Sequence, residues 1–219
     1  MRYALPIALV VALALYFVVA PHREPRLLRA RARRVGEDLR IRHGFREGSK
    51  AAWSEVIATG WPPFHYGRRR MLDGELIGAL HGLPVRIAGY EAVTSGSRHR
   101  YGLAVVVLPR PLDWMEVRGE RPFSAARIPE HVPDGRLTLG VPDFDARWTV
   151  YADTPDAILV AGSRLLVETM LGAPSRLNWR TNGNELLLWV RDGWSGATET
   201  VSALNAVMNL FGLADRSEV

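Results

Sequence analysis

The residues that could bind a ligand are few, and they are spread along the chain. The densest cluster combines positive charge with hydrogen-bond donors, at His65, Tyr66, Arg68, Arg69 and Arg70. Such a group can bind an anion, although a charge run of this kind is also typical of a solvated strand end. We therefore treat His65, Tyr66, Arg68 and Arg70 as a candidate anion site.

Motifs for catalysis and for cofactors are missing from the sequence. It contains no phosphate-binding glycine loop, no dinucleotide fingerprint and no nucleophile elbow. It has no cysteine, and its six histidines form no His-x-x-x-His pair. Because zinc needs such ligands at short spacing, the sequence favours neither a metal nor another cofactor. We predict a non-enzymatic protein with no catalytic, cofactor-binding or metal site.

Two further pairs have the right side chains for chemistry. Asp143 and Asp145 could hold a cation, but acids this close to Pro142 usually belong to a turn. His81 and His99 could approach each other across a meander of strands, although a surface position is the more usual role of a histidine. We predict no site at either pair.

An apolar segment, Tyr3–Ala20, must position the basic residues that follow it. Its eighteen residues carry no charge. As a helix it would be about 27 Å long, close to the roughly 30 Å hydrocarbon core of a bilayer. We predict an uncleaved transmembrane anchor over residues 1–21. A signal peptide cleaved after Val18-Val19-Ala20 is the alternative, and the sequence leaves it open.

Charge is distributed unequally around the apolar segment. Only Arg2 precedes it, whereas six arginines follow closely: Arg23, Arg26, Arg29, Arg31, Arg33 and Arg34. The positive-inside rule then predicts a single-pass protein of the cell membrane with its body in the cytoplasm. In that position the six arginines could also contact anionic lipid headgroups, although membrane topology alone explains them.

The net charge separates this segment from the rest of the chain. Residues 1–50 have a net charge of +7, and residues 51–219 have a net charge of −2. A body that binds nucleic acid should itself be basic. We therefore predict the membrane, anionic headgroups and an unidentified protein as partners, and no nucleic acid.

Hydrophobic periodicity predicts the elements of the body. We divide the chain into an anchor (1–21), a basic juxtamembrane helical segment (22–60), a soluble domain (61–214) and a tail (215–219). Helical patterns cover 25–46, 49–61, 155–171 with a break at Gly162, and 197–211. Alternating patterns predict strands over 75–81, 85–93, 100–108, 114–118 and 147–152. Asn182-Gly183 predicts a hairpin between strands 177–181 and 185–191, and 119–142 is a long connection.

These elements predict an α+β fold. In it, a mostly antiparallel sheet is covered by two helices, 155–171 and 197–211. A barrel closed by the final helix, similar to pleckstrin-homology folds, is the alternative.

The order of elements over about residues 60–212 resembles a group of uncharacterised actinobacterial membrane-anchored proteins. The resemblance is carried by glycine spacing and strand pattern: Pro63-Phe64-x-x-Gly67, Gly74-x-x-x-Gly78-x-x-x-Gly82-x-Pro84-Val85, Tyr90, Tyr101 to Leu108-Pro109, and Trp148-Thr149-Val150-Tyr151 with the helix Ala157 to Leu171. It implies an anchor followed by an α+β domain, with no activity and no functional residues to transfer.

Together these features favour an interaction or scaffold module at the cytoplasmic face of the membrane. An extracytoplasmic ligand-binding protein is the alternative if the apolar segment is cleaved. A membrane-associated hydrolase is the third candidate, which a convergent polar pocket around His65 or His81 would favour.

Overall fold

The structure is a computed structural model that describes residues 27–49, 53, 57, 63–64, 69–94, 97–119, 135–174 and 177–214. The predicted anchor over 1–21 lies outside these ranges, as does most of the helical pattern over 49–61. In the part of the chain that is described, no helix is long and apolar enough to cross a membrane.

A meander of three long strands, β2 (Arg69–Leu80), β3 (Leu83–Thr94) and β4 (Ser97–Gly119), forms one half of the sheet. The first turn contains only His81 and Gly82, whose φ angles are 50° and 74°. A two-residue hairpin turn of this hand needs positive φ at both positions and matches the right-handed twist of the strands. The predicted strands over 75–81, 85–93 and 100–108 overlap β2, β3 and β4, and the observed strands are longer.

Strand β4 organises the sheet because it pairs with three others. β3 pairs with its first half and β6 (Trp148–Ala152) with its end, while β7 (Leu177–Arg191) pairs along the other edge. The prediction of separate strands over 100–108 and 114–118 is wrong, because β4 continues through Pro109-Arg110-Pro111. The prolines fall in a register shift between Val107 and Leu112, where no ladder hydrogen bond is needed from a proline nitrogen.

The predicted hairpin at Asn182-Gly183 is also wrong. Strand β7 runs straight through these residues, and both of its halves pair with β4. Gly183 does have a positive φ of 57°, but it lies opposite Leu112 at the same register shift. The left-handed glycine therefore makes a bulge that bends the strand, and the chain does not reverse.

The sheet contains β1 (Arg46–Glu47) at one end and β5 (Arg136–Leu137) at the other. Its strands follow the order β1-β2-β3-β4-β6-β5, with β7 beside β4, and every pairing is antiparallel. The predicted α+β class with a mostly antiparallel sheet is confirmed. The sheet is open, so the barrel alternative is wrong.

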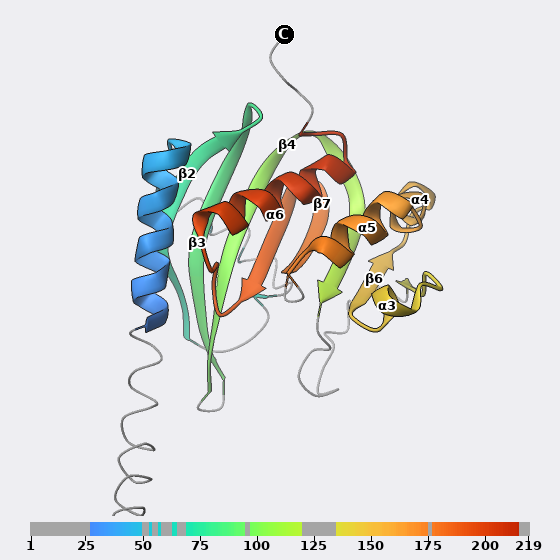
Figure 1. Cartoon of the computed structure of the whole chain (residues 1–219), viewed down its shortest axis with the longest axis horizontal. Coiled ribbons are helices and arrows are strands. Elements are labelled where there is room, and N and C mark those ends of the chain that lie inside the picture. The colour runs from blue at the N-terminus through green and yellow to red at the C-terminus, as the bar shows by residue number, and fades with distance from the viewer. Residues whose placement is uncertain are drawn as a thin grey trace, which may run out of the picture.

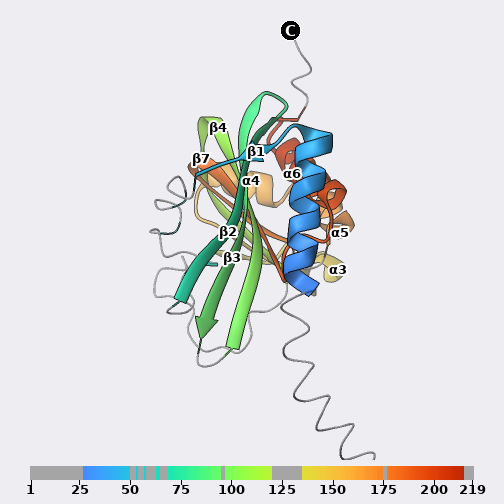
Figure 2. The same ribbon diagram turned by 90° about the vertical axis from the view of Figure 1, so that its left-hand side faces the viewer.

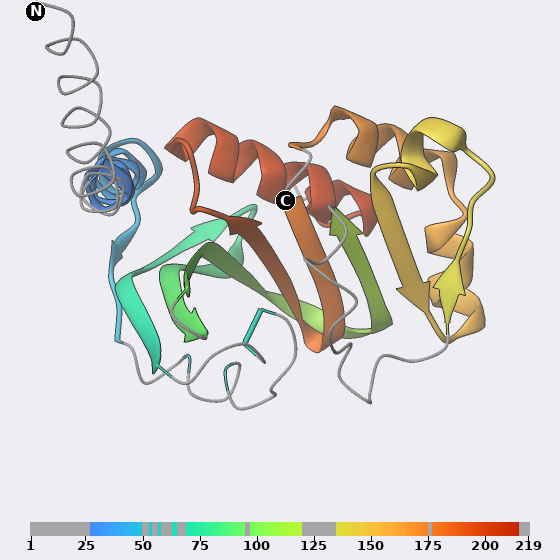
Figure 3. The same cartoon turned by 90° about the horizontal axis from the view of Figure 1, so that it is seen from below.

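Among the residues described after the meander there are four helices: α3 (Pro142–Asp145), α4 (Pro155–Ala161), α5 (Arg164–Gly172) and α6 (Ala197–Leu210). Figures 1 and 3 show α5 and α6 lying across one face of the sheet. The predicted helix over 155–171 is two helices separated at Gly162. Each has its own cap, since the hydroxyls of Thr154 and Ser163 accept hydrogen bonds from Ala157 N and Leu166 N.

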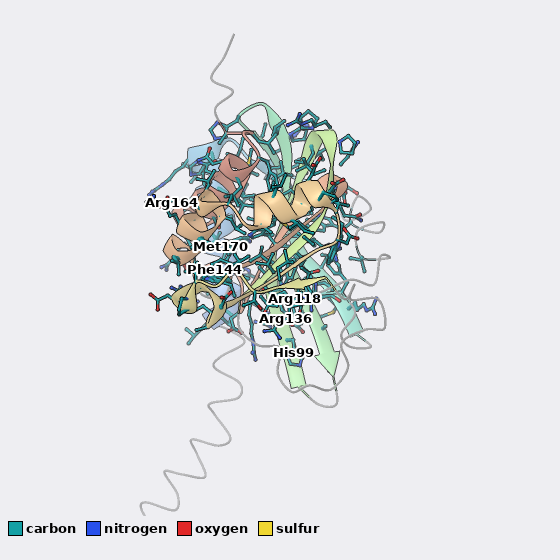
Figure 4. All side chains as sticks on the ribbon, turned by 90° about the vertical axis from the view of Figure 1, so that its right-hand side faces the viewer. His99, Arg118, Arg136, Phe144, Arg164 and Met170 are labelled. Carbon is teal, nitrogen blue, oxygen red and sulfur yellow. The ribbon has the colours of Figure 1, made fainter. Side chains whose placement is uncertain are left out.

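The core has two parts, one on each face of the sheet. The larger part lies under the helices, and Figure 4 shows the side where Phe144 of α3 and the fully buried Met170 of α5 contribute to it. The smaller part packs Trp53 and Phe64 on the opposite face, against Tyr90 and Trp189. Burial on both faces explains the continuous apolar run in β4.

Candidate functional site

Residues 27–43 form a helix, here called the N-terminal helix, that stands at the β2 edge of the sheet (Figure 2). Its second half is held by Val35 and Leu39, which are 6% and 0% exposed and join the larger core. Its first half makes few contacts, because every residue from 29 to 34 is exposed. The helix is therefore fixed at one end and presents the other to solvent.

Four of the six predicted headgroup arginines lie on this exposed half. Arg29 and Arg33 share one side of the helix because they are four residues apart, whereas Arg31 points to the opposite side at about 100° per residue. Arg23 and Arg26 lie outside the described residues. The tertiary structure leaves the four described arginines accessible, which is what contact with a charged surface requires.

The structure describes one of the four predicted anion-site residues. Arg70 is exposed on β2, and His65, Tyr66 and Arg68 lie outside the described residues. Arg70 affects the pKa of Tyr90. Burial raises the pKa of Tyr90, and the positive charge of Arg70 partly opposes that rise. Tyr90 is 2% exposed and packs edge-on against Phe64 at 5.1 Å between ring centres.

The structure does not assemble a site at either of the other two candidate pairs, His81 with His99 and Asp143 with Asp145. His81 lies in the β2–β3 turn and bonds through Nε2 to Asn205 Oδ1 of α6 at 3.0 Å. His99 lies on β4, opposite Ala92 near the other end of β3. Asp145 accepts a hydrogen bond from Leu139 N at 3.1 Å, as a turn residue does. No group of three metal-ligating side chains occurs among the residues described.

A groove of about 1120 Å³ separates the N-terminal helix from β2, β3 and β4. Its apolar floor includes Leu76 and Ile87, and its mouth includes Met71, which is 52% exposed. The loop after β7 forms the wall opposite the helix, with Trp194 buried at 5% exposure. The sequence did not reveal this groove, because its walls come from segments more than 150 residues apart.

Ion pairs neutralise much of the charge around the groove. On the floor, the Glu91 carboxylate lies 2.8 Å from Arg100 Nε and 3.2 Å from Arg98 Nε. On the helix side, Arg40 bridges to Glu37 and to Glu47. In contrast, no ion pair joins Arg29, Arg33 or Arg34 to a carboxylate within the described ranges. These three arginines line the groove and remain available to an outside anion.

A buried charge cluster crosses the other face of the sheet. Glu116 of β4 is fully buried and pairs with Arg118, and it lies opposite Arg180 of β7. Burial lowers the pKa of Arg180 to about 10, and the nearby charges of Glu116 and Glu185 resist that fall. Glu116 and Arg118 are two residues apart on one strand, so they face the same side. That spacing was the only sequence signal for this cluster.

Glu75 is the second buried carboxyl group of interest. It lies at the β2 bulge, where Gly74 has a φ of 61°, and it is 5% exposed. Burial raises the pKa of Glu75, while the Trp53 indole and the positive charge of Arg86 act in the opposite direction. Both of its carboxylate oxygens are buried, and the residue is part of the groove lining.

The described site is thus an arginine-bearing helix with an apolar groove behind it, on an open antiparallel α+β sheet. Neither a protein-family model nor a curated protein matches the sequence.

A solved structure does share the fold: the crystal structure of the mycobacterial trehalose monomycolate transport factor A, TtfA. The two chains superpose with a TM-score of 0.56 at 15% identity, over 84% of this chain and 95% of that one. At this identity the likeness shows the fold alone. The neighbour is a transport factor from an actinobacterium, which agrees in part with the predicted actinobacterial resemblance.

Proposed function

We propose that this protein is a single-pass, membrane-tethered accessory factor that acts by binding at the cytoplasmic face and catalyses no reaction. The observation that carries the proposal is the set of four accessible arginines on the exposed half of the N-terminal helix. These follow closely on an apolar segment, Tyr3–Ala20, whose length matches a bilayer. We propose that the arginines hold the helix against anionic headgroups.

The fold of the solved neighbour supports a more specific version of this role. That neighbour is named as a transport factor for trehalose monomycolate. By analogy, we propose that this chain assists the movement of a membrane lipid, as a scaffold for other components of the membrane. The proposal places no catalytic step on the chain.

The orientation is tested with single cysteines, because the native chain has none. A Leu159→Cys variant places a thiol on α4, at a side chain that is 73% exposed. In spheroplasts, a membrane-impermeant maleimide should label it only after the membrane is permeabilised. Labelling in intact spheroplasts would contradict the cytoplasmic placement. A mature mass that begins at Pro21 would instead favour the cleaved signal and an extracytoplasmic body.

The arginine contact is tested with a peptide of residues 21–48 and a variant in which Arg29, Arg31, Arg33 and Arg34 are glutamine. At ~1 kcal/mol per arginine near an anionic surface, the variant should lose about 4 kcal/mol of binding, roughly 10³-fold. Binding of the native peptide should require anionic vesicles and should weaken with salt. Equal binding to neutral vesicles would refute the electrostatic role and leave the arginines as a topology signal.

A further inference from the structure

The groove behind the N-terminal helix is closed at one end and open at the other. The closed end is formed where Val35 and Leu39 pack into the core, and a Cβ on Gly36 would lie 3.7 Å from Leu76 Cδ1. Toward residue 28 the helix no longer packs on the sheet, because residues 29–34 are all exposed. The groove is therefore a wedge that widens toward the start of the helix.

Two glycines in the floor of the wedge let neighbouring groups pack directly against the strands. Gly89 of β3 and Gly102 of β4 are directly paired and line the groove. A side chain at Gly102 would collide with Trp194, whose Cδ1 would lie 2.5 Å from an added Cβ. Leu76, Ile87 and Met71 give the floor an apolar surface, which lies beside the ion pair of Glu91 and Arg100. At about 1120 Å³ the wedge exceeds most ligand pockets, which measure about 300–1,000 Å³.

The chemistry of the mouth selects an anionic amphiphile. Arg29 and Arg33 are one helical turn apart, and both line the groove. The carboxylate of Glu91 on the floor is already paired with two arginines. Asp73 and Asp192 also line the groove, so an anionic group is expected on the helix side, away from them. An apolar channel that ends at accessible cations suits a hydrocarbon chain with an anionic head.

The position of the mouth indicates where such a molecule would come from. Six residues separate Ala20 from Leu27, and a chain of that length spans at most about 25 Å. If Tyr3–Ala20 crosses the bilayer, the mouth of the wedge is held near the headgroup layer. We propose that the wedge receives one acyl chain of an anionic membrane lipid, with its headgroup at Arg29 and Arg33. This inference rests on the membrane placement proposed above.

The test uses the full chain in phosphatidylcholine nanodiscs that contain spin-labelled phosphatidylglycerol. A fluorophore is attached at Met71→Cys in the mouth, at Leu27→Cys at the start of the helix, or at Leu159→Cys on α4. A label midway along the acyl chain should quench the Met71 reporter strongly and the Leu159 reporter little. A spin label on the headgroup should quench the Leu27 reporter if the body lies at the membrane surface.

A matched pair of variants separates the wedge from general closeness to the bilayer. Ala32 lines the groove and Ala30 does not, and both are exposed on the same helix. Ala32→Trp should abolish the quenching of the Met71 reporter, and Ala30→Trp should leave it unchanged. Spin-labelled phosphatidylcholine should quench the Met71 reporter less than the phosphatidylglycerol probe.

Two results would overturn the inference about the wedge, and the Leu27 reporter distinguishes them from a failure of the proposed membrane placement. Mid-chain quenching at Met71 that is no stronger than at Leu159, or that survives Ala32→Trp, would show that no acyl chain enters the wedge. If the Leu27 reporter is quenched in that experiment, membrane placement stands and only the wedge is refuted. If the Leu27 reporter is not quenched either, both proposals are wrong.

Discussion

Replacing Thr181 with valine should destabilise the fold far more than its small change in shape suggests. Thr181 is fully buried on β7, beside the place where β4 shifts register between Leu112 and Met115. Its hydroxyl accepts a hydrogen bond from Met115 N at 3.1 Å and donates one to Asp113 O at 2.6 Å. One hydroxyl thus provides hydrogen-bond partners for Met115 N and Asp113 O, two backbone groups that the irregular strand pairing leaves without a partner.

The expected cost follows from those two backbone groups. Valine has nearly the same shape as threonine, so the cavity term is small, but both backbone groups lose their partner. A buried polar group left without a hydrogen bond costs about 1–3 kcal/mol. We expect a loss of about 2–4 kcal/mol in the free energy of unfolding, a large share of the typical 5–15 kcal/mol. For a body of this size, that corresponds to a fall in Tm of about 4–16 °C.

Urea denaturation of the full chain in a mild detergent, followed by tryptophan fluorescence, measures this difference. Thr149→Val on β6 is the matched control, since Thr149 is only half-buried and lies opposite Arg118. The control should change the free energy of unfolding by less than about 0.5 kcal/mol. A loss for Thr181→Val no larger than the control would show that the hydroxyl does not support the bulge.

Two other buried groups give predictions of the same kind. Arg180→Met should lower the free energy of unfolding by about 3–5 kcal/mol, because Glu116 stays buried with one partner fewer. In urea denaturation, the double variant Arg180→Met with Glu116→Gln should recover part of that loss. Strictly additive losses would contradict the coupling between the two residues. Since burial raises the pKa of Glu75 above its ordinary value of about 4.5, the folded state binds an extra proton, and stability should fall as pH rises from that value through the raised pKa. Glu75→Gln should flatten this part of a Tm-against-pH curve, and an unchanged curve would show that Glu75 does not cause it.

Local patterns in the sequence determined much of the fold. The alternation in β2 and β3, the caps before α4 and the apolar stripe of α6 each depend on residues a few positions apart. Such short-range rules specify which face of an element is buried and where a helix begins. The α+β class and the exposed basic helix followed from them. The arginines could be identified as candidates because the positive charge of an arginine is known from the sequence alone.

The tertiary structure decided what depends on distant partners. Pro109-Arg110-Pro111 resembles a strand end and Asn182-Gly183 resembles a turn, yet both lie inside long strands because β4 and β7 pair on either side of them. The ion pair partners of Glu116 and the walls of the groove likewise come from segments far apart in the chain. Periodicity states that a strand has a buried face, but it does not state which strand lies beside it or in what register. Pairing energy over many residues can override a local turn signal, and only the folded chain shows where it does.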